Sequence, residues 1–303
     1  MDKHWDHYCA LSLVHFLAFP EFGSGEGPIL ESVARLCDDE FFSVLELSWI
    51  KDPAKRTAVA QLIAQSHMQV GFGAQPIILG GKLNLNSLDR AERDVAISAL
   101  KPNIDQAAEI GAHHFELLSG RDPGAADRSA ATAAFADSLN VLCEYARQYQ
   151  INIVLETFDR DVDKKALIGP APEAAALTSN VMASSPNFGL LYDMGHMVLL
   201  DETPLPAMTL LKEHLVHIHV GNAVKVPNRP SYGDNHPRFG FPGSENDVPQ
   251  LVEFLRALFA VGYLRESPVR PWVGFEIKPQ PGETSAIVLA NLKRAWREAW
   301  AQV

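Results

Sequence analysis

Short apolar runs that suit β-strands alternate along the whole chain with longer runs of helical periodicity, and this alternation constrains the fold more than any other feature. The apolar runs place Val, Ile, Leu and Phe at successive positions, as from Ile151 to Leu155. Continuous apolar runs of this length are typical of strands that are covered on both faces. We expect eight strands, at residues 8–15, 41–47, 68–78, 112–118, 151–156, 188–193, 214–220 and 271–277.

Helical patterns fill the intervals between these strands. They span residues 27–38, 53–67, 87–110, 125–149, 170–184, 203–213, 247–262 and 283–301. Eight strand-then-helix units without a low-complexity linker predict a (β/α)8 TIM barrel that forms a single domain over residues 1–303. A doubly wound open sheet is the alternative, but no glycine-rich turn follows the first strand, as a dinucleotide-binding sheet would require.

Charge and composition exclude several classes of protein. The formal net charge of -11 argues against a protein that coats nucleic acid, which needs a basic surface. No apolar run approaches the length of a membrane span, and the first residues lack the positive charge of a signal peptide. The three cysteines lie far apart and are expected to be buried thiols. We therefore expect a cytoplasmic protein that binds neither nucleic acid nor membranes and acts on small molecules.

Four successive predicted strands end in side chains that can bind a metal. Strands five to eight end in Glu156, Asp193, His219 and Glu276. Active sites of such barrels form at the carboxyl ends of the strands, so these four side chains should converge. Three converging carboxylates repel one another unless a cation lies between them. The oxygen-rich ligand set favours Mn²⁺, with Mg²⁺, Co²⁺ or Zn²⁺ as alternatives.

These four strand-end motifs resemble those of the xylose isomerase-like superfamily of barrels, which includes sugar isomerases, sugar epimerases and endonuclease-IV-type enzymes. The resemblance covers the second half of the chain, whereas the first half agrees only in its β/α rhythm. It implies that Glu156 and Glu276 bind the metal and also exchange protons with the sugar. It implies further that His196 contacts substrate oxygen atoms near the metal.

The connection after strand seven is unusually long, from Gly221 to Asn246, and such loops are usually functional or disordered. Its composition suits an ordered wall of the active site. It holds five of the expected substrate contacts, which are Asn222, Lys225, Asp234, His236 and Arg238. Ketose epimerases resembling this chain usually carry an acidic residue and a downstream Arg where Asn222 and Lys225 stand. A pair of loop residues that only hydrogen-bond to each other remains an equal interpretation of Asp234 and His236.

Two other residues have less specific interpretations. His217 precedes His219 by two positions and should face the same side one layer deeper, as a packed neighbour of the ligands. Glu46, near the end of strand two, is expected to bind substrate or to pair with a cation. The predicted ends of strands three and four, at residues 77–79 and 117–119, lack the histidines that the trinuclear endonuclease pattern requires.

The leading functional hypothesis is a divalent-metal-dependent sugar isomerase or epimerase that abstracts a proton next to a carbonyl. A metal-dependent lyase that eliminates a group from a keto-sugar or keto-glycoside is the second hypothesis. DNA repair of the endonuclease-IV type and a non-catalytic sugar-binding barrel are the remaining alternatives. The partner is expected to be a small carbohydrate, and a homo-oligomer or a partner subunit is left open.

Overall fold

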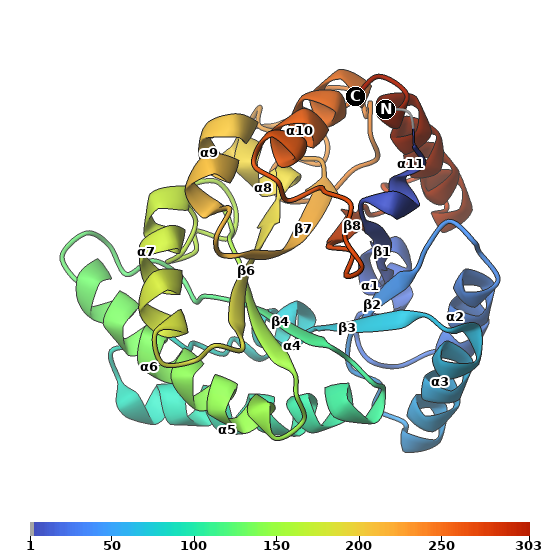
Figure 1. The fold of residues 1–303 in the computed structure, drawn as a ribbon. Helices are drawn as coiled ribbons and strands as arrows, with labels where there is room; N and C mark the ends of the chain where they lie inside the picture. Colours follow the sequence, from blue (N-terminus) through green and yellow to red (C-terminus); the bar gives the residue numbers. More distant parts are fainter. Residues whose placement is uncertain (1–2) are drawn as a thin grey trace.

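The strands form one closed parallel barrel in the computed structural model, which describes residues 3–303 (Figure 1). Each strand pairs with the next one along the chain, and β1 pairs with β8 to close the barrel. The strands are β1 (Ala10–Val14), β2 (Val44–Leu47), β3 (Gln69–Gly73), β4 (His114–Leu118), β5 (Asn152–Glu156), β6 (Phe188–Asp193), β7 (Leu215–Gly221) and β8 (Trp272–Glu276). The predicted (β/α)8 barrel is therefore confirmed.

Helices surround the barrel on the outside (Figure 1). The longer helices are α2 (Ile29–Cys37), α3 (Pro53–Ser66), α5 (Arg90–Glu109), α6 (Arg128–Arg147), α7 (Ala171–Met182), α9 (Pro204–Leu211), α10 (Val248–Ala260) and α11 (Ser285–Trp300). Shorter helices are α1 (His15–Ala18), α4 (Gln75–Gly81), α8 (Met194–Leu199) and the 3-10 turns η1 (Trp5–His7) and η2 (Pro20–Phe22). Because α1, α4 and α8 follow β1, β3 and β6 almost directly, they lie at the carboxyl end of the barrel.

The prediction for strand three was wrong at its end. The strand stops at Gly73, and the chain turns at Ala74 into α4 instead of continuing as a strand to residue 78. Pro76 stands in the first turn of α4, where its fixed φ and missing N–H suit a helix start. The side chains of Ile77 and Ile78 are buried against the barrel even though they lie on a helix. A short apolar run is therefore compatible with both a strand and a helix.

The strand register places the predicted ligands at neighbouring heights. Asp193 pairs in register with His219, His219 with Gly274, and Gly221 with Glu276. The barrel interior also contains polar side chains below this level, including Ser12, Glu46, Glu116 and His217, all of them buried. A polar barrel interior is costly unless its groups are paired, so these side chains need partners within the barrel.

Two further predictions can be compared with this fold. All three cysteines are free thiols; Cys9 and Cys143 are buried as expected, whereas Cys37 is only partly buried, contrary to the prediction. Among residues 3–303, no helix is both long enough and apolar enough to cross a membrane.

Candidate active site

The four predicted metal ligands come together at the carboxyl end of the barrel. The His219 Nδ1 atom lies 2.9 Å from Glu276 Oε2 and 3.6 Å from Glu156 Oε1. Glu156 and Glu276 each place an oxygen within 4.8 Å of the other, and Asp193 and Glu276 do the same. All four side chains are at least nine-tenths buried. Glu276 of β8 is thus the common neighbour of the other three predicted ligands, which come from β5, β6 and β7.

These residues fit a divalent cation. The Asp193 Oδ1 atom caps α8 by accepting hydrogen bonds from the backbone N–H groups of Gly195 and His196. Its Oδ2 atom and Glu156 Oε1 are buried without a hydrogen-bond donor. A Cβ atom at Gly221 would lie 2.9 Å from Asp193 Oδ2, so the glycine keeps this space open. Buried carboxylate oxygens without donors are what a hard cation would satisfy.

The two candidate proton-transfer carboxylates have different electrostatic surroundings. Burial, together with the Glu156 carboxylate, raises the pKa of Glu276, although His236 and His219 oppose this. Burial alone would also raise the pKa of Glu156, but the imidazoles of His219 and His196 and the Gln75 amide outweigh it and lower that pKa. Opposite shifts in two neighbouring carboxyl groups are typical of an acid and a base that work as a pair.

The long loop reaches this cluster through Asp234 and His236. The Asp234 Oδ1 atom lies 2.9 Å from His196 Nε2 and 2.6 Å from His236 Nε2, and its Oδ2 atom lies 2.9 Å from Lys164 Nζ. Burial would raise the pKa of Asp234, but the two imidazoles hold it well below its ordinary value. The His236 Nε2 atom also lies 3.5 Å from Glu276 Oε1. The Asp234–His236 pair therefore joins the loop to the site.

His196 is oriented from both of its ring nitrogens. Its Nδ1 atom lies 2.8 Å from the Thr157 carbonyl oxygen and its Nε2 atom faces Asp234. Burial would lower the pKa of His196, but the carboxylates of Asp234, Asp193 and Glu156 raise it well above its ordinary value. His196 thus presents an imidazole beside Glu156, at the position the sequence predicted.

Three of the predicted substrate contacts do not reach the cluster. The Asn222 amide nitrogen donates to the carbonyls of Arg238 and Asn246, and its oxygen accepts from the backbone N–H of Asn246, so it fastens the loop to itself. Lys225 pairs with Asp201. Arg238 pairs with Glu283 at 2.8 Å. The contacts that the structure gives these side chains hold the loop and its surroundings, and their contact with substrate stays a prediction.

A cleft of about 340 Å³ opens above Glu276. Its polar lining residues include Asp234, His236, Glu276 and Lys278. Its apolar lining residues, which we call the apolar wall, include Phe16, Leu17, Pro20, Pro76 and Leu79. The cleft therefore offers contacts of both kinds to a ligand.

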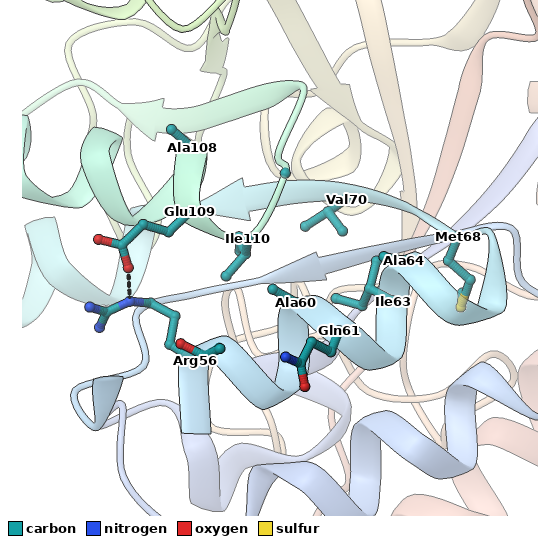
Figure 2. Close-up of a pocket in the computed structure, with 12 residues that line it drawn as sticks. Arg56, Ala60, Gln61, Ile63, Ala64, Met68, Val70, Ala108, Glu109 and Ile110 are labelled. Carbon is teal, nitrogen blue, oxygen red and sulfur yellow. Dashed lines mark hydrogen bonds and ion pairs between the residues drawn. The ribbon is translucent and has the colours of Figure 1, made fainter. Parts of the chain in front are cut away.

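A larger hollow, of about 670 Å³, lies outside the barrel between α3 and α5 (Figure 2). Its charged side chains are Arg56 and Glu109, which pair with each other across it. None of its lining residues belongs to the cluster of titratable side chains. The smaller cleft, not this hollow, is the candidate active site.

The family model of the xylose isomerase-like TIM barrel matches residues 37–298. The chain belongs to this family. The match spans most of the chain, including all four predicted ligands and the long loop. The family resemblance inferred from strands five to eight is therefore confirmed, and it extends into the first half of the chain. No curated protein sequence matches the chain.

Solved structures with the fold of this xylose isomerase-like barrel include several sugar-converting enzymes. D-psicose 3-epimerase from Clostridium cellulolyticum H10, solved with D-tagatose, is 17% identical, with a TM-score of 0.67 and 96% of each chain covered. The IolI protein with a bound zinc atom is 14% identical, with a TM-score of 0.74 and coverage of 97% and 98%. The 3-keto-D-glucoside 4-epimerase of E. coli is 15% identical, with a TM-score of 0.65 and coverage of 90% and 95%.

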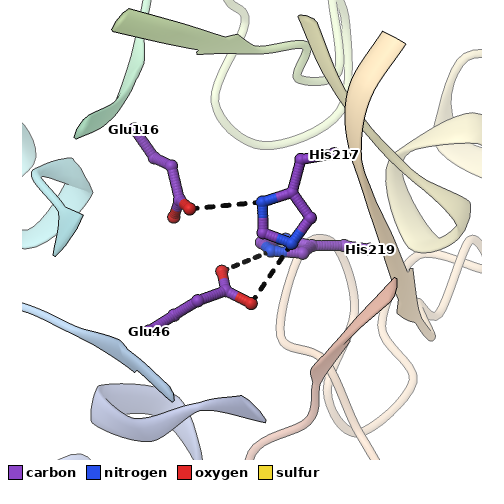
Figure 3. A group of neighbouring side chains, drawn as sticks. All are labelled: Glu46, Glu116, His217 and His219. Atoms are coloured by element: carbon purple, nitrogen blue, oxygen red, sulfur yellow. Dashed lines mark hydrogen bonds and ion pairs between the residues drawn. The ribbon is translucent and has the colours of Figure 1, made fainter. Parts of the chain in front are cut away.

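Several residues of this xylose isomerase-like site escaped the sequence analysis. The Gln75 amide donates to Glu156 Oε2 at 2.8 Å, but residue 75 lay inside a predicted strand. Lys164 lies in a loop that has no recognisable pattern, and Glu116 lies in an apolar strand where a single Glu carries no signal. Glu46, whose partner was undecided, lies 2.6 Å from His219 Nε2 (Figure 3).

Proposed function

We propose that the chain is a divalent-metal-dependent sugar isomerase or epimerase that abstracts a proton next to a carbonyl group. One observation carries this proposal: Glu156 and Glu276, from strands β5 and β8, approach within 4.8 Å of each other, and Glu276 lines the cleft. Proton transfer to and from carbon needs a carboxylate in reach of the carbon, and two carboxylates allow transfer on two faces. Mn²⁺ is the proposed ion.

The chain's own residues divide the work as follows. Glu156, oriented by the Gln75 amide, takes the proton from the carbon beside the carbonyl. Glu276 returns a proton to the opposite face of the same carbon, which gives epimerisation, or to the neighbouring carbon, which gives isomerisation. His236, held by Asp234 at its Nε2 atom, donates a hydrogen bond to a substrate oxygen from its unpartnered Nδ1 atom, and His196 fixes Asp234 from the other side. A bound cation, held by Glu156, Asp193, His219 and Glu276, supplies positive charge that stabilises the enediolate.

A lyase acting on a keto-glycoside is the second candidate, and the apolar wall of the cleft favours it. A free ketose exposes hydroxyl groups on all sides and gains little from Phe16, Leu17 and Leu79. A substituent on the sugar would bury its apolar surface against that wall. The same proton abstraction then continues as elimination: the carbon–oxygen bond to the substituent breaks and the departing oxygen takes up a proton. One solved relative by fold, the 3-keto-D-glucoside 4-epimerase, also carries a keto-glycoside in its name.

Proton exchange in D₂O tests both candidates. The Mn²⁺-loaded protein would be incubated with ketohexoses and with keto-glycosides that carry an apolar substituent, and deuterium uptake and products would be followed by NMR. We expect deuterium at the carbon beside the carbonyl, and loss of at least about 100-fold in exchange rate for Glu156→Gln and for Glu276→Gln. Release of the substituent would favour the lyase.

Binding of a sugar without exchange in the unmodified protein would overturn the enzymatic proposal and favour a binding barrel. Metal analysis separates the nuclease alternative, because that chemistry needs a trinuclear centre, whereas we expect one ion per chain. Glu202→Gln is a suitable control, since its carboxylate pairs with Tyr192 and the N–H of Ala171 away from the cleft.

A further inference from the structure

Buried titratable side chains continue from the candidate metal cluster down the barrel axis. His219 is the uppermost: its Nδ1 atom faces Glu276 and Glu156, and its Nε2 atom lies 2.6 Å from Glu46 Oε2 (Figure 3). Beneath it, His217 lies with Nε2 3.4 Å from Glu46 Oε1 and Nδ1 3.2 Å from Glu116 Oε1. All of these side chains are more than nine-tenths buried, so solvent does not compete for their contacts.

The Glu46 carboxylate is held from two sides. Its Oε1 atom accepts a hydrogen bond from Ser12 Oγ of β1 at 2.5 Å, while its Oε2 atom faces His219 of β7. The hydrogen bond between a carboxylate and a buried imidazole is stronger when a second donor, here Ser12, holds the carboxylate in one orientation. Glu46 thus reaches the His219 ring across the barrel interior, because Glu46 lies on β2 and His219 on β7.

Two strand glycines make room for this arrangement. A Cβ atom on Gly274 would lie 2.5 Å from Glu46 Oε1, 2.6 Å from Ser12 Oγ and 2.7 Å from His219 Cδ2. A Cβ atom on Gly71 would lie 2.8 Å from Glu116 Oε1 and 3.2 Å from Glu46 Cγ. Any other residue on these inward-facing strand positions would clash, so the space for Glu46 beside His219 is built into β3 and β8.

The lower group is better explained as a support than as a second metal site. One ligand atom from each of Glu46, Glu116, His217 and His219 falls within 4.8 Å of the others. However, the His217 ring lies between the two carboxylates, with one of them at each ring nitrogen. The imidazole itself bridges the carboxylates and occupies the place that a shared ion would need.

We propose that Glu46 is a positioning residue that orients His219 for metal binding. By accepting the Nε2–H of His219, Glu46 leaves the Nδ1 atom, on the side of Glu156 and Glu276, as the ring nitrogen that would bind the ion. Metal-binding histidines are generally oriented through their second nitrogen in this way, and the partner also makes the ring a stronger ligand. The proposal rests on the metal dependence proposed above and assigns the ligand atom of His219 to Nδ1.

Metal affinity provides the first test, with Zn²⁺ as the probe and a chromophoric chelator as the competitor. We expect Glu46→Ala to weaken Zn²⁺ binding about 100-fold and Glu46→Gln, which keeps an acceptor oxygen, about 10-fold. Glu116→Gln is the matched control, because Glu116 is equally buried but contacts His217 and not His219. We expect its Zn²⁺ affinity to stay within about threefold of the unmodified protein. Thermal unfolding of each variant establishes that it folds.

The tautomer of His219 provides a readout that loss of stability alone would not change. In ¹⁵N-labelled Zn²⁺-loaded protein, the His219 signals should show the ion on Nδ1 and the proton on Nε2, and Glu46→Ala should abolish this preference while Glu46→Gln retains it. Folded Glu46 variants with unaltered affinity and tautomer would overturn this inference and leave the proposed function standing. Absence of Zn²⁺ binding by the unmodified chain would overturn both, and two bound ions per chain would overturn the interpretation of the lower group as a support.

Discussion

At the scale of the residue, Asp193 shows how one side chain serves both the fold and the site. Its Oδ1 atom caps α8, and its Oδ2 atom is buried without a donor and faces the cluster. Asn is as good a helix cap as Asp, but it offers no anionic oxygen to a cation. The two roles can therefore be separated by a single substitution.

Replacing Asp193 with Asn should preserve folding and weaken metal binding. We expect the free energy of unfolding of the apo protein to change by less than about 1 kcal/mol, because the cap to Gly195 and His196 is retained. Zn²⁺ affinity should fall at least about 10-fold. Chelator competition and urea unfolding measure the two effects. Equal Zn²⁺ affinity in Asp193→Asn and the unmodified protein would show that Asp193 is not a ligand.

His15 predicts how stability depends on pH. Burial lowers the pKa of His15 to about 3, and its ring packs against Phe19 and Phe22 with Nε2 2.8 Å from Ser32 Oγ. Between about pH 6.5 and pH 3, the His15 imidazole is protonated in the unfolded chain but neutral in the folded protein. The free energy of unfolding therefore decreases as the pH falls through this window. In His15→Gln, the slope of the unfolding free energy against pH should be smaller by up to about 1.4 kcal/mol per pH unit in this window.

Urea unfolding at several pH values between 6 and 4 measures this slope. Only the slope decides the matter, because Gln also alters packing against Phe19 and Phe22 and so changes the free energy of unfolding at every pH. Parallel curves for His15→Gln and the unmodified protein would contradict the prediction.

At the scale of the element, the loop after β7 behaves as part of the barrel wall. Asn222 joins its two ends through the Arg238 and Asn246 backbones, while Asp234 and His236 join its middle to the cluster. Long loops that carry functional residues need internal hydrogen bonds of this kind to stay in one conformation.

Asn222→Ala should loosen this loop. The substitution leaves buried backbone donors and acceptors without partners, which should lower the free energy of unfolding by about 2 kcal/mol or more. Cleavage by trypsin after Lys225 should become faster. Val226→Ala, at a half-exposed position of the same loop, is the control and should change stability by less than about 0.5 kcal/mol. Similar cleavage rates for both variants would argue against the anchoring role.

Much of this architecture could be predicted from the sequence, because strand and helix periodicities are local properties. Four ligands at strand ends could also be predicted, since parallel strands in a barrel bring their carboxyl ends together. The contact of Gln75 with Glu156 could not be predicted, because the run from Pro76 to Leu79 suits a strand and a helix equally. The partners of Glu46 and Glu116 could not either, since these contacts join strands far apart in the chain and depend on barrel register. The sequence places Asn222, Lys225 and Arg238 in the loop that contacts the cluster. Their partners within the loop and its surroundings could not be predicted, because these contacts depend on the loop's conformation.

At the scale of the whole molecule, the barrel concentrates like charges at its carboxyl end. Glu156, Asp193 and Glu276 are brought together by the closure of the sheet, and a bound cation would offset the part of their repulsion that the neighbouring imidazoles leave uncompensated. Metal binding should therefore stabilise the entire barrel, not only the cluster.

Addition of Zn²⁺ or Mn²⁺ at 100 times its dissociation constant should raise the free energy of unfolding by about 2.7 kcal/mol. For a single domain of this size the melting temperature should rise by roughly 5 °C, and EDTA should reverse the change. Scanning calorimetry measures it. An equal rise in the double variant Asp193→Asn, Glu276→Gln would show that the ion acts elsewhere.

The short helix α4 has a consequence for how a large substrate would be processed. Gln75, at its first turn, holds Glu156, and Leu79, one turn later, forms part of the apolar wall. In the proposed mechanism, a substrate group that contacts Leu79 would also act on the Gln75 amide, because both side chains belong to the same short helix. Binding energy from a bulky substituent would then help to align Glu156 and raise kcat, in addition to lowering KM.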